Sequence, residues 1–477
     1  MPRGLPELRL KNHFSGEGLR SRVIRGTAIS LAGTGGQQLL RLLSNLILTR
    51  LLFPEAFGLM ALIQTFIVGL QMFSDIGVRP SIIQNKRGED PDFLNTAWTV
   101  QIIRGVVLWL VSCALAWPLS VFYDEPQILG LMPVVGLSAL IAGFSTTKTA
   151  VANRKFKLGR QTVIGLCTQA LGIVVMIGLA WIWPSVWALV IGSLISGLAG
   201  VLAGHRFMEG IPNRLRWDSS AARDLLSFGR FIFVSTLAGF FINQGDKLFL
   251  GKFVSLGDLG VYNIAFFMAG FPGTLGGMIA ARILFPLYRE IRPSQNAGNR
   301  AKIRRARNLL TGSLVLMFGG LALIGVPLID LLYDDRYAGA GSMLIIMALM
   351  QIPNALVMGN NQLLLAEGDS RRFSHLVVVR GIAYFLMLFL SFWLLGLLGV
   401  LLTKGLVIVL TYPMQQRFLA RYKGTDIPRD ALFALFGIGV AVLAVWINWT
   451  SVSEFCAASR AMAPAVTGTW LPVSIFH

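Results

Sequence analysis

Thirteen long apolar stretches, separated by short polar segments, dominate the sequence. A helix needs about 20 residues to cross about 30 Å of hydrocarbon, and each stretch approaches or exceeds that length. The runs are too continuous for the alternating strands of an outer-membrane barrel, so they predict transmembrane helices. The stretches cover residues 23–48, 57–82, 95–117, 128–150, 162–183, 186–203, 228–249, 260–285, 309–332, 341–365, 374–395, 399–415 and 431–449.

Composition supports a membrane protein and excludes a water-facing globule. Of the 477 residues, 55% are apolar and only 14% are charged, whereas a soluble protein needs about a quarter of its residues charged. The mean hydropathy is +0.66. The polar segment 1–22 contains no short apolar core with a cleavage site, so we expect no removable signal peptide.

The net charge of +19 is concentrated in alternate loops. Basic loops are retained on the cytoplasmic side, so this alternation predicts a cytoplasmic N-terminus. It also explains the basic excess without nucleic acid, which we exclude as a partner. The basic segments are 86–87, 154–160, 206–223, 289–307, 371–372 and 417–429.

The first six predicted spans resemble the next six. At an offset of 202 residues, RLL at 50–52 aligns with KFV at 252–254, and FGL at 57–59 aligns with LGV at 259–261. Six is an even number, so the repeat is parallel, an arrangement that transporters use to place a substrate path between two halves. We therefore predict an all-α polytopic membrane protein with about 13 transmembrane helices, in two parallel six-helix repeats around a central cavity.

The predicted organisation follows from these spans. It comprises a cytoplasmic basic N-terminus at 1–22, a six-helix bundle at 23–205, a cytoplasmic linker at 206–227, a second bundle at 228–420, an extra transmembrane helix at 431–449 and a tail at 450–477. The predicted loops are short and leave no room for a soluble catalytic domain. We therefore expect that the protein is not an enzyme and acts between its helices.

Polar residues inside the spans are candidates for substrate binding, because an intramembrane charge is costly unless it is paired or hydrated. Arg41 and Asn45 recur at helical spacing in the first span. Asn243, Asp246 and Lys247 do the same in the seventh, at the repeat-related positions. Helix–helix contacts through polar side chains are the alternative explanation for both stripes.

A second set of candidates lies near the basic ends of spans two and eight. Asp75 and Arg79 are four residues apart, a spacing that permits an ion pair on one helix face, either structural or functional. Arg282 lies at the matching end of span eight.

The charged residues within or near the spans are mostly cations. Only two are acidic, Asp75 and Asp246. This excess of positive charge favours a transporter of an anionic substrate, because a cation-coupled drug exporter should instead carry carboxylates within the membrane. The six cations are Arg41, Arg79, Arg104, Arg282, Lys247 and Lys404. Four scattered histidines and three cysteines show no metal-binding spacing, and we expect neither a metal nor a cofactor.

Two motifs carry a family resemblance. The sequence LLFPEAFGL at 51–59, and FSDIGV at 73–78 followed by IIQ at 82–84, resemble the polysaccharide-transporter family of Wzx-type flippases, within the multidrug/oligosaccharidyl-lipid/polysaccharide exporter superfamily. The resemblance implies two bundles around an alternating-access cavity. It also implies translocation of an undecaprenyl-pyrophosphate-linked oligosaccharide for exopolysaccharide or O-antigen synthesis.

The resemblance also implies roles and partners. Arg41, Lys247 and Arg282 match the family's cationic cavity, and a polysaccharide polymerase and chain-length machinery are expected partners besides the lipid-linked oligosaccharide and the bilayer. Family members commonly have twelve or fourteen spans. The thirteen predicted here are an odd number, so with a cytoplasmic N-terminus the tail would end outside. A cation-coupled multidrug exporter, a lipid II flippase and a membrane glycosyltransferase or polymerase are the alternatives.

Overall fold

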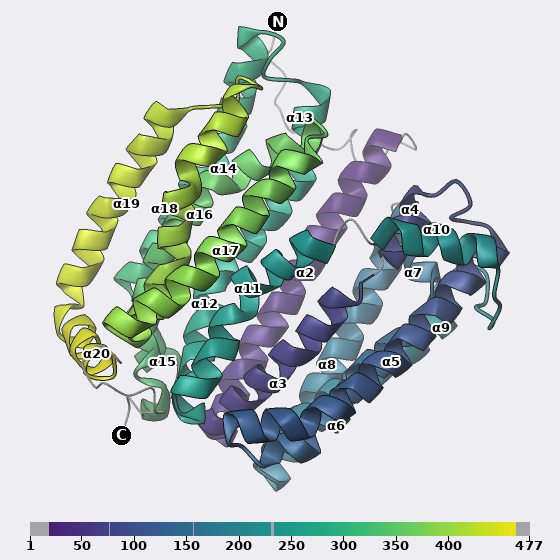
Figure 1. The fold of residues 1–477 in the computed structure, drawn as a ribbon, viewed down its shortest axis with the longest axis horizontal. Coiled ribbons are helices and arrows are strands. Elements are labelled where there is room, and N and C mark those ends of the chain that lie inside the picture. Colours follow the sequence, from purple (N-terminus) through teal and green to yellow (C-terminus); the bar gives the residue numbers. More distant parts are fainter. Residues whose placement is uncertain (1–18, 76, 156, 230–232, 464–477) are drawn as a thin grey trace, which may run out of the picture. The chain divides into compact units, whose positions relative to one another are not determined.

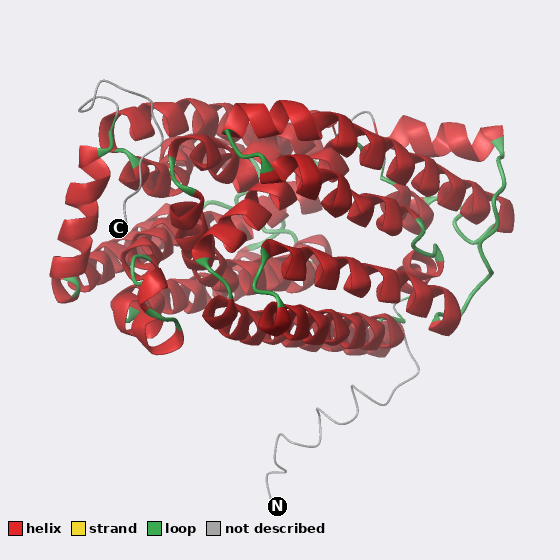
Figure 2. Ribbon diagram, turned by 90° about the horizontal axis from the view of Figure 1, so that it is seen from below, coloured by secondary structure: helices red, strands yellow, loops and turns green. Residues whose placement is uncertain are grey.

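A computed structural model describes residues 19–75, 77–155, 157–229 and 233–463, and these residues are helical or in loops, with no strand among them (Figure 2). Each of the thirteen predicted stretches is mostly helical where it is described, and some contain short breaks. The all-α, multi-pass architecture is therefore confirmed. The expectations for residues 1–18 and for the end of the tail, 464–477, lie outside the described residues.

The chain forms two compact units, of which the first comprises residues 1–48 and 74–232. In this unit α5 packs along α6, α8 along α9, and α6 against α9 (Figure 1). Short helices α4, α7 and α10 gather at the end where its basic loops lie. Its helices are α2 (Leu19–Leu51, the last turn of which belongs to the second unit), α4 (Val78–Gln84), α5 (Pro91–Tyr123), α6 (Gln127–Gly143), α7 (Lys148–Arg154), α8 (Gly159–Ile182), α9 (Val186–Phe207) and α10 (Ser219–Gly229).

The second unit comprises residues 49–73 and 233–477, and α16 lies at its centre. This helix contacts α12, α14, α18 and α19, and it is apolar and largely buried along its length. The helices of the unit are α3 (Pro54–Phe73), α11 (Phe233–Phe253), α12 (Leu256–Ile279), η1 (Ala280–Leu284), α13 (Phe285–Glu290), α14 (Ala297–Leu323), α15 (Gly325–Leu332), η2 (Asp335–Tyr337), α16 (Ala340–Ala366), α17 (Ser370–Leu395), α18 (Leu397–Ala420), α19 (Ile427–Ile447) and α20 (Trp449–Ala461).

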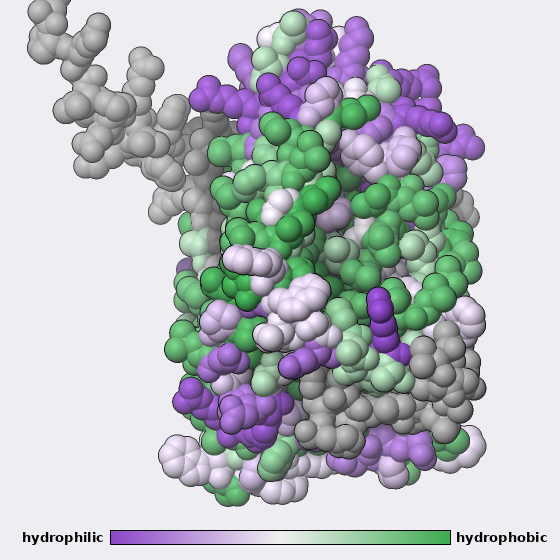
Figure 3. All heavy atoms as spheres, turned by 90° about the vertical axis from the view of Figure 1, so that its left-hand side faces the viewer, coloured by the Kyte–Doolittle hydropathy of each residue, from purple (hydrophilic) through white to green (hydrophobic). Residues whose placement is uncertain are grey.

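Within the described residues, ten helices are long and apolar enough to cross a membrane, or eleven if the bent pair α6 and α7 is one span. The thirteen-span count, the repeat and the predicted bundle boundaries stay predictions. Figure 3 shows the side of the second unit on which α19 lies, with a broad apolar band between more hydrophilic ends. Such a band is what a bilayer requires of the surface that it covers.

Several predicted spans are interrupted rather than continuous. Gly77 adopts φ 69°, in the left-handed region that favours glycine, and it separates α3 from α4. A bend of 58° separates α6 from α7. Between α12 and α13 the chain makes a π-helical turn at Ala280–Leu284, and Pro286, which follows, has no amide hydrogen to continue the regular ladder.

Helices α3 and α12 cross at two glycines, within the second unit (Figure 1). A Cβ atom at Gly58 would lie 1.9 Å from the carbonyl oxygen of Leu256, and one at Gly260 would lie 2.0 Å from that of Pro54. The two contacts are reciprocal, since Gly58 and Gly260, like Pro54 and Leu256, differ by 202 positions. This difference equals the offset of the predicted repeat. The crossing requires that the two backbones approach each other without side chains between them.

Candidate functional site

The polar stripe of α2 lies on a single continuous helix in the first unit. At one end of the stripe α2 packs on α8, where the Gln169 amide Nε2 donates to the Gln37 carbonyl at 2.9 Å. One turn further along, the Arg41 side chain is exposed, and Asn45 follows after another turn, half-buried. The helix thus carries Arg41 and Asn45 on one face, as the spacing predicts.

The expectation that Asp75 and Arg79 share one helix face is wrong. Helix α3 ends at Phe73 and α4 begins at Val78, so the i,i+4 relationship on which the expectation depended does not exist. Instead the Asp75 carboxylate accepts from the Gly77 amide at 2.9 Å and lies 3.9 Å from Arg104 on α5. Arg104 also donates to the Ser74 hydroxyl at 2.9 Å, and both residues at the break are therefore held to α5.

In the second unit, Asp246 on α11 is buried and hydrogen-bonded. Its side chain is 4% exposed. One carboxylate oxygen accepts from the backbone amide of Lys247 at 2.9 Å, and the other accepts a short hydrogen bond from the Tyr262 hydroxyl on α12. The carboxylate is therefore firmly placed inside an apolar unit.

Two lysines approach the same aromatic ring beside this carboxylate. The Lys247 ammonium lies 4.4 Å from the ring centroid of Phe266, and the Lys404 ammonium lies 5.5 Å from it. Asp246 and Lys404 also line one small cavity of about 30 Å³, the room of a single water molecule. Two lysines with one aspartate leave this group of residues with a net positive charge, which an anionic group can complement.

The remaining predicted residues of the second unit lie apart from that cavity lining. Asn243 is exposed and donates to the Gly239 carbonyl one turn earlier on α11, at 2.7 Å. Arg282 is half-buried on the π-helical turn after α12. Turns of this kind are rare and occur often at functional sites.

Sequence reasoning missed several polar groups of the second unit. The buried Arg380 on α17 donates to the Thr411 hydroxyl at 3.0 Å and to the Gln415 side-chain oxygen at 2.8 Å, both on α18. Tyr262 and Tyr384, which line the cavity with Asp246, were not singled out either. Arg380 was available as an intramembrane cation, whereas the tyrosines carried no signal in the sequence.

A second buried network, near the basic end of this unit, is structural. Arg307 on α14 contacts Asp430 at 3.2 Å and Asp426 at 3.7 Å, and it donates to Asn360 at 2.9 Å. The Tyr412 hydroxyl donates to Asp430 at 2.8 Å. These contacts join α14, α16, α18 and α19. No group of three or more potential metal ligands occurs in the part of the chain that the structure describes.

Comparison with known proteins identifies the family to which the chain belongs. A family model described as polysaccharide biosynthesis protein matches residues 47–342, which is more than half of the chain. The succinoglycan biosynthesis transport protein ExoT of Rhizobium meliloti is 22% identical over 69% of this chain and 65% of its own length. The teichuronic acid biosynthesis protein TuaB of Bacillus subtilis is 21% identical, over 62% of each chain. The match thus spans less than two thirds of these relatives.

Three further similar proteins extend this result. The lipopolysaccharide biosynthesis protein WzxC of Escherichia coli is 22% identical over 57% of this chain and 56% of its own. Among solved structures, the lipid II flippase MurJ has a TM-score of 0.70 at 11% identity, with 90% of this chain and 98% of that chain covered. An inward-facing multidrug MATE transporter has a TM-score of 0.58 at 13% identity, with 88% and 99% covered. At these identities the likeness concerns the fold.

Proposed function

Because the chain belongs to the polysaccharide biosynthesis protein family, we propose that it translocates an undecaprenyl-pyrophosphate-linked oligosaccharide across the inner membrane by alternating access. The product would serve exopolysaccharide or O-antigen synthesis. The observation that carries this proposal is the pair of lysines, Lys247 and Lys404, over Phe266 beside the single carboxylate of Asp246. Net positive charge on membrane helices suits a pyrophosphate.

The proposed roles combine the positions of Asp246, Lys247 and Lys404 with the sequence-based expectations for the other residues. Lys247 and Lys404 attract the pyrophosphate, while Asp246, fixed by Tyr262, limits their mutual repulsion. Arg41 and Asn45, in the first unit, and Asn243 and Arg282, in the second, are further residues that contact the cargo in this proposal. Asp75 and Arg79 flank the break before α4, where a helix end can move. The polyprenyl chain stays in the bilayer.

The proposal includes a setting for the protein. In this proposal the N-terminus lies in the cytoplasm with the basic loops, and the protein works as a transporter without catalysis, beside a polysaccharide polymerase and chain-length machinery. The similarity to proteins named for polysaccharide biosynthesis or its transport supports this setting.

A lipid II flippase is the second candidate, favoured by the TM-score of 0.70 to MurJ. A multidrug exporter coupled to protons or sodium is a third, and it would need a carboxylate that exchanges its cation. The hydrogen bonds that Asp246 accepts from Tyr262 and from the Lys247 amide do not favour such exchange.

The test is genetic and biochemical. We expect deletion of the gene to cause accumulation of undecaprenyl-linked oligosaccharide in extracted lipids and loss of surface polysaccharide. Wild-type protein should reverse both effects. Lys247→Gln and Lys404→Gln should each lower export about tenfold or more, since a charge-assisted contact contributes about 1.5–3 kcal/mol.

The matched control is Lys302→Gln, which removes the same charge from an exposed site at the start of α14. It should export normally. Unchanged lipids and polymer after deletion would contradict the proposal. Rescue of a strain without its own lipid II flippase would favour the second candidate, and drug efflux that depends on Asp246 would favour the third.

A further inference from the structure

An open groove lies between α8 and α9 at the basic end of the first unit. Its volume is about 540 Å³, within the range of small-molecule sites. The walls are largely apolar and come from Val163 and Ile164 on α8 and from Ala203 and Phe207 on α9. Val163 and Phe207 are each 58% exposed, so the walls are open at the surface of the unit. The groove therefore offers an apolar channel along two membrane helices.

Arginines are the charged residues that line this groove. Arg160 stands at the first turn of α8 and Arg206 at the last turn of α9, and both line it. The Arg160 guanidinium donates to the Phe207 carbonyl at 3.1 Å, which holds it against the end of α9. A cationic end and an apolar wall thus share one depression, as a molecule with an anionic head and a hydrocarbon tail requires.

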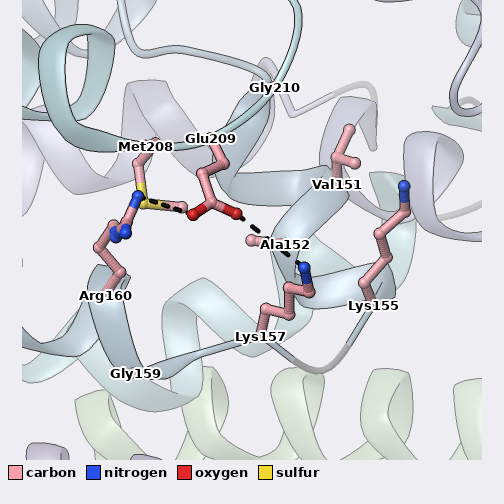
Figure 4. Close-up of a pocket in the computed structure, with 9 residues that line it drawn as sticks. All are labelled: Val151, Ala152, Lys155, Lys157, Gly159, Arg160, Met208, Glu209 and Gly210. Carbon is pink, nitrogen blue, oxygen red and sulfur yellow. Dashed lines mark ion pairs between the residues drawn. The ribbon is translucent and has the colours of Figure 1, made fainter.

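A second depression of about 410 Å³ adjoins the first, because Arg160 lines both (Figure 4). Here Glu209 lies between Arg160, at 3.0 Å, and Lys157, at 3.9 Å. Lys155 points away from this pair and contacts Glu89 at 2.6 Å. The linings of the two depressions together carry four cations, Lys155, Lys157, Arg160 and Arg206, and one carboxylate, Glu209.

We infer that the groove binds an anionic glycerophospholipid of the surrounding leaflet. Its phosphodiester lies between Arg160 and Arg206, and an acyl chain follows the apolar wall past Val163 and Ala203. Guanidinium groups match phosphate in geometry and charge, and basic pockets between membrane helices at the cytoplasmic side bind acidic lipid headgroups. A soluble anion would use the arginines and leave the apolar channel empty, whereas a phospholipid fills both. This site does not depend on the proposed cargo.

The experiment uses the full-length protein, delipidated in detergent and examined by native mass spectrometry with cardiolipin, phosphatidylglycerol or phosphatidylcholine. We expect wild-type protein to retain the two anionic lipids in preference to phosphatidylcholine. Arg160→Gln with Arg206→Gln should weaken cardiolipin binding about 30-fold, from about fivefold per basic residue near a membrane surface. Ala203→Phe should weaken it as well, since it fills the apolar channel without any change of charge.

The control pair is Arg214→Gln with Arg223→Gln, which removes two charges from exposed sites of the same unit outside the groove. It should bind cardiolipin like wild type. Equal losses in both pairs, or no preference for anionic lipid, would overturn the inference, because binding would then be diffuse. Displacement of cardiolipin by undecaprenyl pyrophosphate at lower concentration would also overturn it and assign the groove to the cargo. If the arginine pair failed to fold, normal cardiolipin binding by Ala203→Phe would decide against the site.

Discussion

Phe266 presents one ring to two ammonium groups, and its aromatic face stabilises charges that would otherwise repel each other. A cation–π contact contributes about 0.5–2 kcal/mol, with the larger values where water is excluded. Phe266→Leu should therefore lower the stability of the protein by about 1–2 kcal/mol, measured by thermal unfolding in micelles. Phe266→Tyr keeps the aromatic face and should remain close to wild type. Equal destabilisation by both substitutions would show that ring volume alone matters.

Asp218 makes a pH-dependent contact at the start of α10. Hydrogen bonds from the Arg87 guanidinium, and then from the amide and hydroxyl of Ser220, lower its pKa from 3.8 to about 2. The Arg87 contact, at 3.0 Å, ties the loop before α10 to the loop after α4. Since the folded-state pKa is below the unfolded value, the stabilisation is complete above pH 3.8 and is lost as pH falls towards 2.

This gives a local prediction for α10. Amide exchange across Ser219–Gly229, corrected for the intrinsic rate, should increase as pH falls through this window. Asp218→Asn should raise exchange at neutral pH and remove the pH dependence. Exchange in the variant that still followed the wild-type pH profile would contradict the assignment to Asp218.

Helix packing depends on backbone approach where α3 crosses α12. Gly58→Ala and Gly260→Ala each place a methyl group about 2 Å from a carbonyl oxygen, so the helices must separate. We expect a loss of about 1–3 kcal/mol for each, as for other overpacked contacts. The two substitutions open the same crossing, and the double variant should lose less than their sum.

The matched control lies on the same helix. A Cβ atom at Gly270 of α12 meets no atom within 4 Å, so Gly270→Ala should be neutral or stabilise the helix by up to about 1 kcal/mol. Thermal unfolding of the purified proteins measures the stability of the two single variants, the double variant and this control. A control that destabilised as much as Gly58→Ala would refute the close approach as the cause.

The network around Arg307 allows the stability contribution of a buried ion pair to be compared with that of a more exposed one. Asp430→Asn leaves the guanidinium without one of its carboxylates in a buried site, and breaking such a pair costs about 3–5 kcal/mol. Arg304→Gln removes a contact with Asp426 at 3.3 Å from a side chain that is 44% exposed, which should cost less than about 1 kcal/mol. Chemical unfolding compares them. Equal losses would mean that burial does not decide their contributions.

Hydrophobic pattern could predict where helices occur but not where they break. Length and hydropathy located every helix that covers a predicted span, because a bilayer demands an apolar run of fixed length. The interruption before α4 depends on a single glycine, Gly77, and on contacts of Asp75 with α5, which no periodicity records. For the same reason the Asp75–Arg79 spacing was misleading. Spacing predicts proximity only along one continuous helix.

Part of the candidate site could be predicted from the sequence, and part of it could be found only from the fold. Intramembrane lysines and arginines stand out in an apolar sequence, so Lys247, Arg41 and Arg282 could be identified. The partners of Asp246, by contrast, come from α12 and α18, and only the fold brings Tyr262 and Lys404 to the same cavity. Aromatic residues are common in membrane spans, so Tyr262, Tyr384 and Phe266 gave no signal before the helices were placed.

At the scale of the whole molecule, the alternation of basic loops predicts how the helices are oriented across the membrane, and this orientation can be tested. In the second unit the loop before α14 is basic and the loop between α15 and α16 contributes only Arg336. Basic loops stay in the cytoplasm. In a variant whose native cysteines, Cys113, Cys167 and Cys456, are replaced by serine, Ser294→Cys should react with an impermeant thiol reagent only after the inner membrane is permeabilised. Ala338→Cys should react in intact spheroplasts.

The predicted count of thirteen spans also predicts the side of the membrane on which α20 lies. If α19 crosses the membrane as its apolar sequence indicates, then α20 lies on the side opposite the basic loop that precedes α19. In the same cysteine-free background, Glu454→Cys, an exposed position on α20, should therefore react in intact spheroplasts, like Ala338→Cys. A reagent that reached Glu454→Cys only after permeabilisation would place α20 in the cytoplasm and give an even number of spans. Because Ser294→Cys and Ala338→Cys mark the two sides independently, that outcome would revise the count and leave the orientation of the second unit intact.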